Sequence, residues 1–337
     1  MQRFCRHNRF IERCPICREA VPGLAPPKGS VRSSRASTAE EGSKTGQAAA
    51  SGTHRSPRVR RRAGLQVSHE RRAEDDGYRS PLAPGLRASQ DALRLVEEIA
   101  FAQGRLLALT VAPPDLYGEM REVEDTEQAM WMCFLSAYLS PLEGPDPFVG
   151  VRTALEADWR AGELPNLDSI PLGPHTSHDP ARGDTTLRAY LQWAARAGSQ
   201  ELAFVGDVAW TAPRRFARLF ERLTLPGVMR MGRYELLLTL GRIGLCELHA
   251  EALYFTNAPG SAHDDLATLA AKRVFGIGDP MHLEHRSQEL AKAVSVPIEA
   301  LDLALANWGT GERATLGVPS EVSDPHALER AQEALGF

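Results

Sequence analysis

The stretch Leu223-Thr-Leu-Pro-Gly-Val-Met-Arg-Met-Gly-Arg-Tyr-Glu-Leu-Leu237 decides how we expect this chain to fold. An apolar helix ends at Leu223, a Leu-Pro-Gly turn follows, and a second apolar helix begins at once. Pro and Gly favour tight turns, because Pro fixes its φ angle and Gly tolerates a positive one. The pattern predicts a helix-hairpin-helix, and an ordinary αα-hairpin that stops at a glycine is the alternative.

The predicted hairpin suggests contact with phosphate. In a helix-hairpin-helix, backbone N–H groups of the turn and of the second helix point at a phosphate group. A glycine usually follows the valine of this motif, but this chain has Met229 there, and the next glycine is Gly232. The residues expected to contact nucleic acid are those of the turn and the arginines around it: Arg218, Arg222, Gly227, Val228, Arg230, Gly232 and Arg233.

Helical periodicity extends on both sides of the hairpin, so we expect an all-α fold with a helical domain over residues 86–312. Residues 126–140 form the most apolar helix, and another is expected over 248–255. Ser89, Asp146, Asp264 or Asp265, and Asp279 stand where helix caps are expected. Residues 313–337 read as a weakly ordered tail, and no strand pattern or internal repeat is present.

Composition narrows the class of protein. The chain has 337 residues and 43% hydrophobic residues, enough for a substantial core. No apolar run reaches the roughly 20 residues that a membrane span needs. Five cysteines are too few for a disulfide framework in a chain of this length, so we expect a reducing, cytoplasmic setting. Residues 1–85 carry a net charge of +9 and residues 86–337 a net charge of −13.

The N-terminal residues 1–21 carry a metal-binding pattern. Cys5 and His7 form one close pair, and Cys14 and Cys17 form a second, Cys-Pro-Ile-Cys pair. Zinc prefers four nitrogen or sulfur ligands in a tetrahedron, so this spacing predicts a structural Zn²⁺ knuckle. The alternatives are a dithiol redox pair and a segment without metal.

Residues 22–85 are rich in Pro, Gly, Ser, Ala and Arg and have no apolar period. Such a segment cannot bury enough apolar surface to offset the entropy of ordering, so we expect a disordered, basic linker. Its run Arg55–Arg62 is either a patch for nucleic acid or another polyanion, or a solvated charged linker.

Three segments resemble the helix-hairpin-helix DNA glycosylase superfamily over residues 124–310. They are Trp131-Met-Cys-Phe-Leu-Ser-Ala-Tyr-Leu-Ser, Leu225-Pro-Gly-Val and Gly278-Asp-Pro-Met-His-Leu-Glu-His-Arg. The chain looks most like a divergent branch, the α-glutamyl/putrescinyl thymine pyrophosphorylases. That resemblance implies an enzyme that replaces an activated group on a modified thymine in DNA.

The resemblance also implies a catalytic pair. In glycosylases of this family, an Asp at the start of a helix downstream of the hairpin stabilises positive charge on the sugar or orients a nucleophile. Asp279 is the matching position in this chain. His282 follows at helical spacing and could share its face as an acid–base partner. The bland alternative for Asp279 is an N-cap. No lysine stands at the nucleophile position of the hairpin, so a Schiff-base lyase is not expected.

Two weaker groups of candidates remain. Glu143 and Asp146 lie in a proline-rich connector and are further candidate acids, whereas His175 and His178 are a poor basis for a metal site. We therefore expect a DNA-binding, glycosylase-like enzyme that acts on a modified pyrimidine base. The alternative is a non-catalytic helical module that binds DNA or protein.

Overall fold

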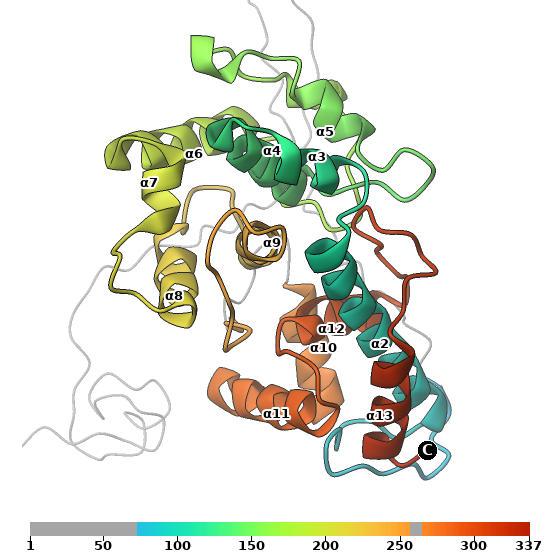
Figure 1. Cartoon of the computed structure of the whole chain (residues 1–337). Helices are drawn as coiled ribbons and strands as arrows, with labels where there is room; N and C mark the ends of the chain where they lie inside the picture. The colour runs from blue at the N-terminus through green and yellow to red at the C-terminus, as the bar shows by residue number, and fades with distance from the viewer. Residues whose placement is uncertain (1–72, 257–264) are drawn as a thin grey trace, which may run out of the picture. The chain divides into compact units, whose positions relative to one another are not determined.

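The computed structural model describes residues 73–256 and 265–337, and within these ranges every regular element is a helix (Figure 1). The predicted zinc knuckle of Cys5, His7, Cys14 and Cys17 lies outside the described residues. Residues 22–72 of the predicted linker lie outside them as well. No helix in the described ranges is both long enough and apolar enough to cross a membrane. The described helices are α2 (Ser89–Val111), α3 (Leu116–Glu122), α4 (Thr126–Leu139), α5 (Val149–Ala154), α6 (Gly183–Ala197), α7 (Gln200–Val205), α8 (Ala212–Arg222), α9 (Arg230–Arg242), α10 (Leu266–Phe275), α11 (Pro280–Ala293), α12 (Ala300–Thr310) and α13 (Pro325–Leu335), with short 3-10 turns at Trp159–Ala161 and Leu167–Ser169.

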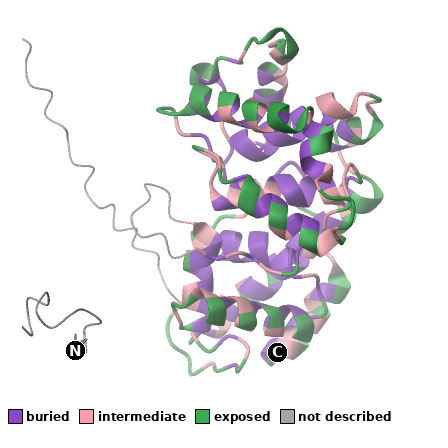
Figure 2. Cartoon of the chain, turned by 90° about the vertical axis from the view of Figure 1, so that its left-hand side faces the viewer, coloured by how far each residue is buried: buried purple, intermediate pink, exposed green. Residues whose placement is uncertain are grey.

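Helix α9 lies between two groups of helices (Figure 1). On one side it packs against α4, which belongs with α3 and α5 to α7, and on the other it contacts α2. Helix α2 in turn packs along α12 and α13, and α10 packs on α12. Buried residues run through the helices of both groups (Figure 2). The prediction of an all-α fold is therefore confirmed for the described residues.

The apolar sequence of α4 explains its central place. Every residue from Ala129 to Leu139 is buried, which agrees with the prediction of a helix enclosed on most sides. Its aromatic rings stack in a row: the Phe134 ring lies 3.7 Å from that of Tyr190 on α6 and 5.5 Å from that of Trp131. Cys133 is fully buried in this row, and burial raises the pKa of its thiol, so it serves packing rather than chemistry.

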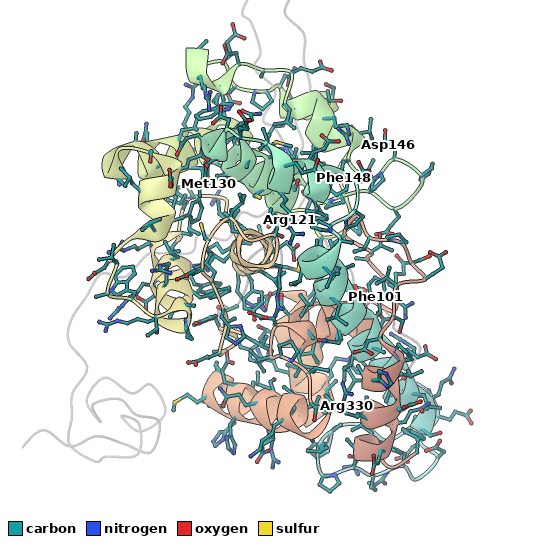
Figure 3. The ribbon with its side chains drawn as sticks, viewed as in Figure 1. Phe101, Arg121, Met130, Asp146, Phe148 and Arg330 are labelled. Carbon is teal, nitrogen blue, oxygen red and sulfur yellow. The ribbon has the colours of Figure 1, made fainter. Side chains whose placement is uncertain are left out.

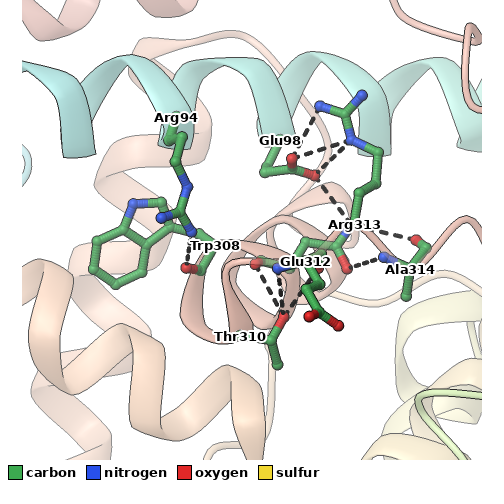
Figure 4. A network of polar contacts seen from close by, with 8 residues as sticks. Arg94, Glu98, Trp308, Thr310, Glu312, Arg313 and Ala314 are labelled. Carbon is green, nitrogen blue, oxygen red and sulfur yellow. Dashed lines mark hydrogen bonds and ion pairs between the residues drawn. The ribbon is translucent and has the colours of Figure 1, made fainter. Parts of the chain in front are cut away.

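Polar contacts join α12 to α2 where the apolar packing ends (Figure 4). Glu98 on α2 accepts hydrogen bonds from Asn307 on α12, at 3.1 Å, and from Arg313 in the loop that follows, at 2.9 Å. Arg94 donates to the carbonyl oxygen of Trp308. Because a buried carboxylate is costly unless paired, this network fixes how α12 lies along α2.

The folded body includes residues on both sides of the expected range 86–312. Asp76 accepts hydrogen bonds from the backbone and hydroxyl of Ser89, so the N-terminus of α2 is capped from outside the helix and not by Ser89 itself. Tyr78 donates a 2.7 Å hydrogen bond to the carbonyl oxygen of Leu335 and stacks on Phe337. Helix α13 packs along α2, so residues 325–335 are helical and part of the core.

Two local expectations were wrong for identifiable reasons. Residues 248–255 are not helical, because carboxylates of other helices take their N–H groups: Glu284 accepts from Leu253 and Phe255. Asp146 does not cap α5, whose N-cap position is Phe148 and has no side-chain cap (Figure 3). The Phe148 ring instead lies fully buried, edge-on to Tyr117 at 5.0 Å. By contrast, Asp265 and Asp279 do cap α10 and α11 as expected.

Candidate functional site: a small buried cavity

The hairpin segment folds as two helices joined by a turn. Thr211 caps α8, and Gly227 of the turn has a φ of +78°, a conformation that suits glycine. A Cβ atom at Gly227 would lie 2.1 Å from the Thr186 hydroxyl, so the turn packs closely on the first turn of α6. Val228 completes the turn, with its N–H donating to the Leu225 carbonyl at 3.1 Å.

The predicted nucleic-acid residues do not share one surface. Arg218 and Arg222 are exposed on α8, where Arg218 pairs with Glu221 at 3.0 Å and Arg222 stacks over the Trp210 ring at 4.8 Å. Arg233 is partly buried and lies over the Phe220 ring at 4.4 Å.

Arg230 is buried, which differs from the expected contact with phosphate. Its guanidinium lies between two carboxylates, with Nε 3.0 Å from Asp265 Oδ2 and Nη2 bonded to Asp302. Gly232, two residues further along α9, packs against the Ser177 hydroxyl in the interior. Both residues are therefore buried rather than exposed on the protein surface, and Gly232 lines the cavity described below.

Asp279 and His282 are exposed, and neither lines the cavity described below. The Asp279 carboxylate accepts the N–H groups of Met281, at 3.0 Å, and His282, at 3.2 Å. This is the capping alternative considered for Asp279. Glu143 is likewise engaged elsewhere, because it accepts the backbone N–H and the hydroxyl of Thr315.

A small, mainly apolar cavity lies where α2, α4, α9 and α12 meet, and apart from Gly232 and His175 its lining residues were not singled out by the sequence motifs. It opens to solvent, and its volume of about 20 Å³ has room for roughly one water molecule. The polar residues that line it are Arg105, Ser136, Ser140, His175, Glu235, Glu299 and Asp302.

An ion pair forms one wall of the cavity. Arg105 on α2 is 1% exposed and binds both carboxylate oxygens of Glu235 on α9. The Thr239 hydroxyl, one turn further along α9, donates to Glu235 at 3.1 Å. The Nε atom of Arg105 is buried and has no hydrogen-bond partner among the described residues.

Other buried polar groups of the cavity also lack partners. The hydroxyls of Ser136 and Ser140 are buried, and neither makes a hydrogen bond within the described part of the chain. Burial lowers the pKa of His175 to about 4, with the charge of Arg105 acting in the same direction, so its ring is neutral at neutral pH. Buried polar groups are nearly always bonded in native proteins, and the grouping of Arg105 Nε, Ser136 and Ser140 around one cavity makes it the candidate ligand site, although other unpaired groups such as the Ser80 and Ser287 hydroxyls lie elsewhere in the described fold.

Asp302 adds a second charged cluster. It lies on α12, binds the buried Arg230, and faces the cavity. Burial raises the pKa of Asp302 to about 7; the neighbouring Asp265 adds to this rise and Arg230 opposes it. His178, by contrast, lies outside this cavity and bonds to the Tyr138 hydroxyl at 3.1 Å, so the two loop histidines are not a pair. No group of metal-binding side chains occurs among residues 73–256 and 265–337.

Residues 158–314 match the family model for alpha-glutamyl/putrescinyl thymine pyrophosphorylase clade 3, and over this segment the chain is similar to that family. The matched segment covers α6 to α12, and so includes His175, Glu235, Glu299 and Asp302 of the cavity. No curated protein and no solved structure matches the chain.

Proposed function

We propose that this protein is an enzyme that acts on a modified pyrimidine base in DNA, and that the cavity between α2, α4, α9 and α12 receives the base. The single observation that carries the proposal is the set of unpaired buried groups at one cavity: Arg105 Nε and the hydroxyls of Ser136 and Ser140. The similarity over residues 158–314 supplies the class of substrate.

The polar groups of the cavity suit a pyrimidine. A thymine-type base presents two carbonyl oxygens, which accept hydrogen bonds, and one ring N–H, which donates. Arg105 Nε and the two serine hydroxyls can donate to the carbonyls, and the neutral His175 or a carboxylate can accept from the ring N–H. A base must leave the duplex to enter such a site. The cavity of about 20 Å³ has room for roughly one water molecule, so entry of a base requires lining side chains such as that of Met231 to move.

The family name joins a thymine, a glutamyl or putrescinyl group and pyrophosphate, and this indicates a substitution. An amine nitrogen attacks the methylene carbon attached to C5 of the base. A C–N bond forms, the C–O bond to pyrophosphate breaks, and the electron pair leaves on the pyrophosphate oxygen. The extra proton on nitrogen passes to a base in the cavity. Buried groups held in place lower the barrier, because they need no reorganisation during the reaction.

The DNA backbone is proposed to contact the exposed arginines of α8, Arg218 and Arg222, together with the turn at Gly227. The body around them is acidic overall, with a net charge of −13 over residues 86–337. Binding through a few arginines should therefore weaken steeply as salt rises, because each phosphate contact releases counterions. Replacing both Arg218 and Arg222 by Gln should reduce the salt slope by about 2.

The test uses DNA that carries 5-(pyrophosphoryloxymethyl)uracil, incubated with putrescine or glutamate and analysed by mass spectrometry. Incorporation of the amine and release of pyrophosphate in equal amounts are the expected result. Arg105→Lys should reduce turnover, because lysine has no Nε–H fork to serve both Glu235 and a ligand. Salt-dependent DNA binding without turnover would favour the alternative of a non-catalytic module, and no DNA binding would refute both.

A further inference from the structure

We propose that Asp302 is the proton acceptor of this cavity, the catalytic residue that takes the proton from the attacking nitrogen; this inference rests on the proposed function. Three carboxylates line the cavity: Glu235, Glu299 and Asp302. They differ in how many of their oxygens are already engaged, and that difference selects Asp302.

Glu235 and Glu299 have no free oxygen for a proton. Arg105 contacts both oxygens of Glu235, and Thr239 donates to one of them. Glu299 accepts the backbone N–H of Ala250 on Oε1, at 2.7 Å, and binds Arg242 through Oε2. Donors that hold a carboxylate in its charged form oppose its protonation.

Asp302 is engaged on one side only. Its Oδ1 accepts from Arg230, and Oδ2 has no hydrogen-bond partner among the described residues. Arg230 also contacts Asp265 at 3.0 Å, and Asp265 does not line the cavity. One buried cation thus serves two carboxylates, and each keeps one oxygen without a hydrogen-bond partner among the described residues. Of the two, only Asp302 faces the cavity.

The charges around Asp302 give the same conclusion. The charged and titratable groups that surround it or share its cavity are Arg105 on α2, His175 in the loop before α6, Arg230, Arg233, Tyr234 and Glu235 on α9, Asp265 before α10, and Glu299 at the N-cap of α12. Arg105 pairs with Glu235, and Arg242 pairs with Glu299. The single charge of Arg230 is instead shared between Asp265 and Asp302. Because Arg230 is shared between two carboxylates, the charge of Asp302 is only partly balanced, and a proton or a cationic group of the substrate balances the rest.

The acid–base behaviour suits this role. Burial raises the pKa of Asp302 to about 7, near the working pH at which a general base is most effective. His175 is a poorer acceptor, since burial lowers its pKa to about 4. In the proposed step, the C–N bond forms, pyrophosphate leaves with the C–O electron pair, and the ammonium proton moves to Asp302 Oδ2.

The experiment compares wild type, Asp302→Asn and Asp265→Asn. Carboxyl titration followed by ¹³C NMR should show one group with a midpoint near pH 7 that disappears in Asp302→Asn. Turnover of the uracil substrate with putrescine should fall about 100-fold or more in Asp302→Asn, the usual effect of removing a general base. In Asp265→Asn, Arg230 serves Asp302 alone, so the titration midpoint and the acid limb of kcat/KM should move together to lower pH.

Three results would overturn the assignment. One is titration of Asp302 below pH 5 in the wild-type protein. Another is an Asp302→Asn protein that keeps its turnover within threefold at pH 8. The third is an acid limb that stays in place in Asp265→Asn while the NMR midpoint moves. A wild-type protein that leaves the DNA unchanged refutes the proposed function itself, and the role of Asp302 falls with it.

A measurement without substrate checks the same group. The folded pKa of Asp302 lies above the value of about 3.9 for Asp in an unfolded chain. Its contribution to stability is therefore fully present below about pH 4 and is lost as the pH rises through about 7. The urea midpoint of wild type should fall relative to that of Asp302→Asn across this window, and a constant difference would contradict the assignment.

Discussion

Replacing Ser136 and Ser140 by alanine should make the protein more stable and its site weaker. Both hydroxyls are buried at the cavity and have no partner in the described fold. A buried hydroxyl that lacks a hydrogen bond costs about 1–3 kcal/mol, and alanine removes that cost without removing a bond. Ser140 has a φ of +63°, but alanine carries the same Cβ, so the strain is unchanged.

The magnitude can be set from these terms. Allowing for lost packing around the missing oxygens, we expect each replacement to raise the free energy of unfolding by about 1 kcal/mol. For a domain of this size, that corresponds to roughly 2–4 °C in Tm per replacement. A substrate that bonds to both hydroxyls loses about 1 kcal/mol with each, so its KM should rise roughly fivefold per replacement.

Ser287 provides a matched control. It is a fully buried serine on α11 whose hydroxyl also lacks a partner in the described fold, and it does not line the cavity. Ser287→Ala should raise the Tm by a similar amount and leave KM for the uracil substrate unchanged. Thermal unfolding and steady-state kinetics on the three single variants separate the two effects.

The reasoning would be refuted in either of two ways. If Ser136→Ala and Ser140→Ala lower the Tm, the hydroxyls are bonded within the fold and are not held for a ligand. If Ser287→Ala raises KM as much as the cavity variants do, the change in KM reflects a general effect of altered packing. In both cases the cavity would lose its claim to be the substrate site.

Three further predictions concern the turn, the cap and the N-terminal segment. Gly227→Ala should lower stability by about 2 kcal/mol or more in urea unfolding, through its positive φ and the clash with Thr186; Thr186→Ala should recover only the part due to the clash. Asp279→Ala should lower the free energy of unfolding by about 1 kcal/mol, seen as a lower Tm, whereas Asp279→Asn can still cap the helix and should lower it little. An equal loss of turnover in both variants would restore the catalytic role of Asp279. Metal analysis should find about one zinc per chain that is lost in Cys14→Ser, and protein with no zinc would end that prediction.

The sequence predicts the helices better than it predicts the site. Apolar periodicity predicted α4 and α8, and an Asp placed just before an apolar helical stretch predicted the caps Asp265 and Asp279. These predictions held because the signals are local. The segment 248–255 has the same apolar character, but its N–H groups bond to Glu284 and Glu299, which lie far along the chain. Tertiary contacts of that kind leave no mark in a short window of sequence.

The cavity was missed for the same reason. Arg105, Ser136, Glu235 and Asp302 come from four helices and form no motif with a recognisable spacing. Arg230 was predicted to contact phosphate, because the sequence does not show that Asp265 and Asp302 fold against it. A usable signal was present in α2, where Glu98 and Arg105 are the two charged residues on a mostly apolar face and must be paired once buried.

The hydrogen bond from Tyr78 to Leu335 spans 257 positions, and α2 packs mainly on α12 and α13. During synthesis, α2 therefore leaves the ribosome long before its partners exist. Its apolar face, with Leu95, Val96 and Ile99, remains largely exposed until α12 and α13 have been synthesised. Contacts so distant along the chain fold slowly, and chaperones have their longest opportunity to bind at this helix.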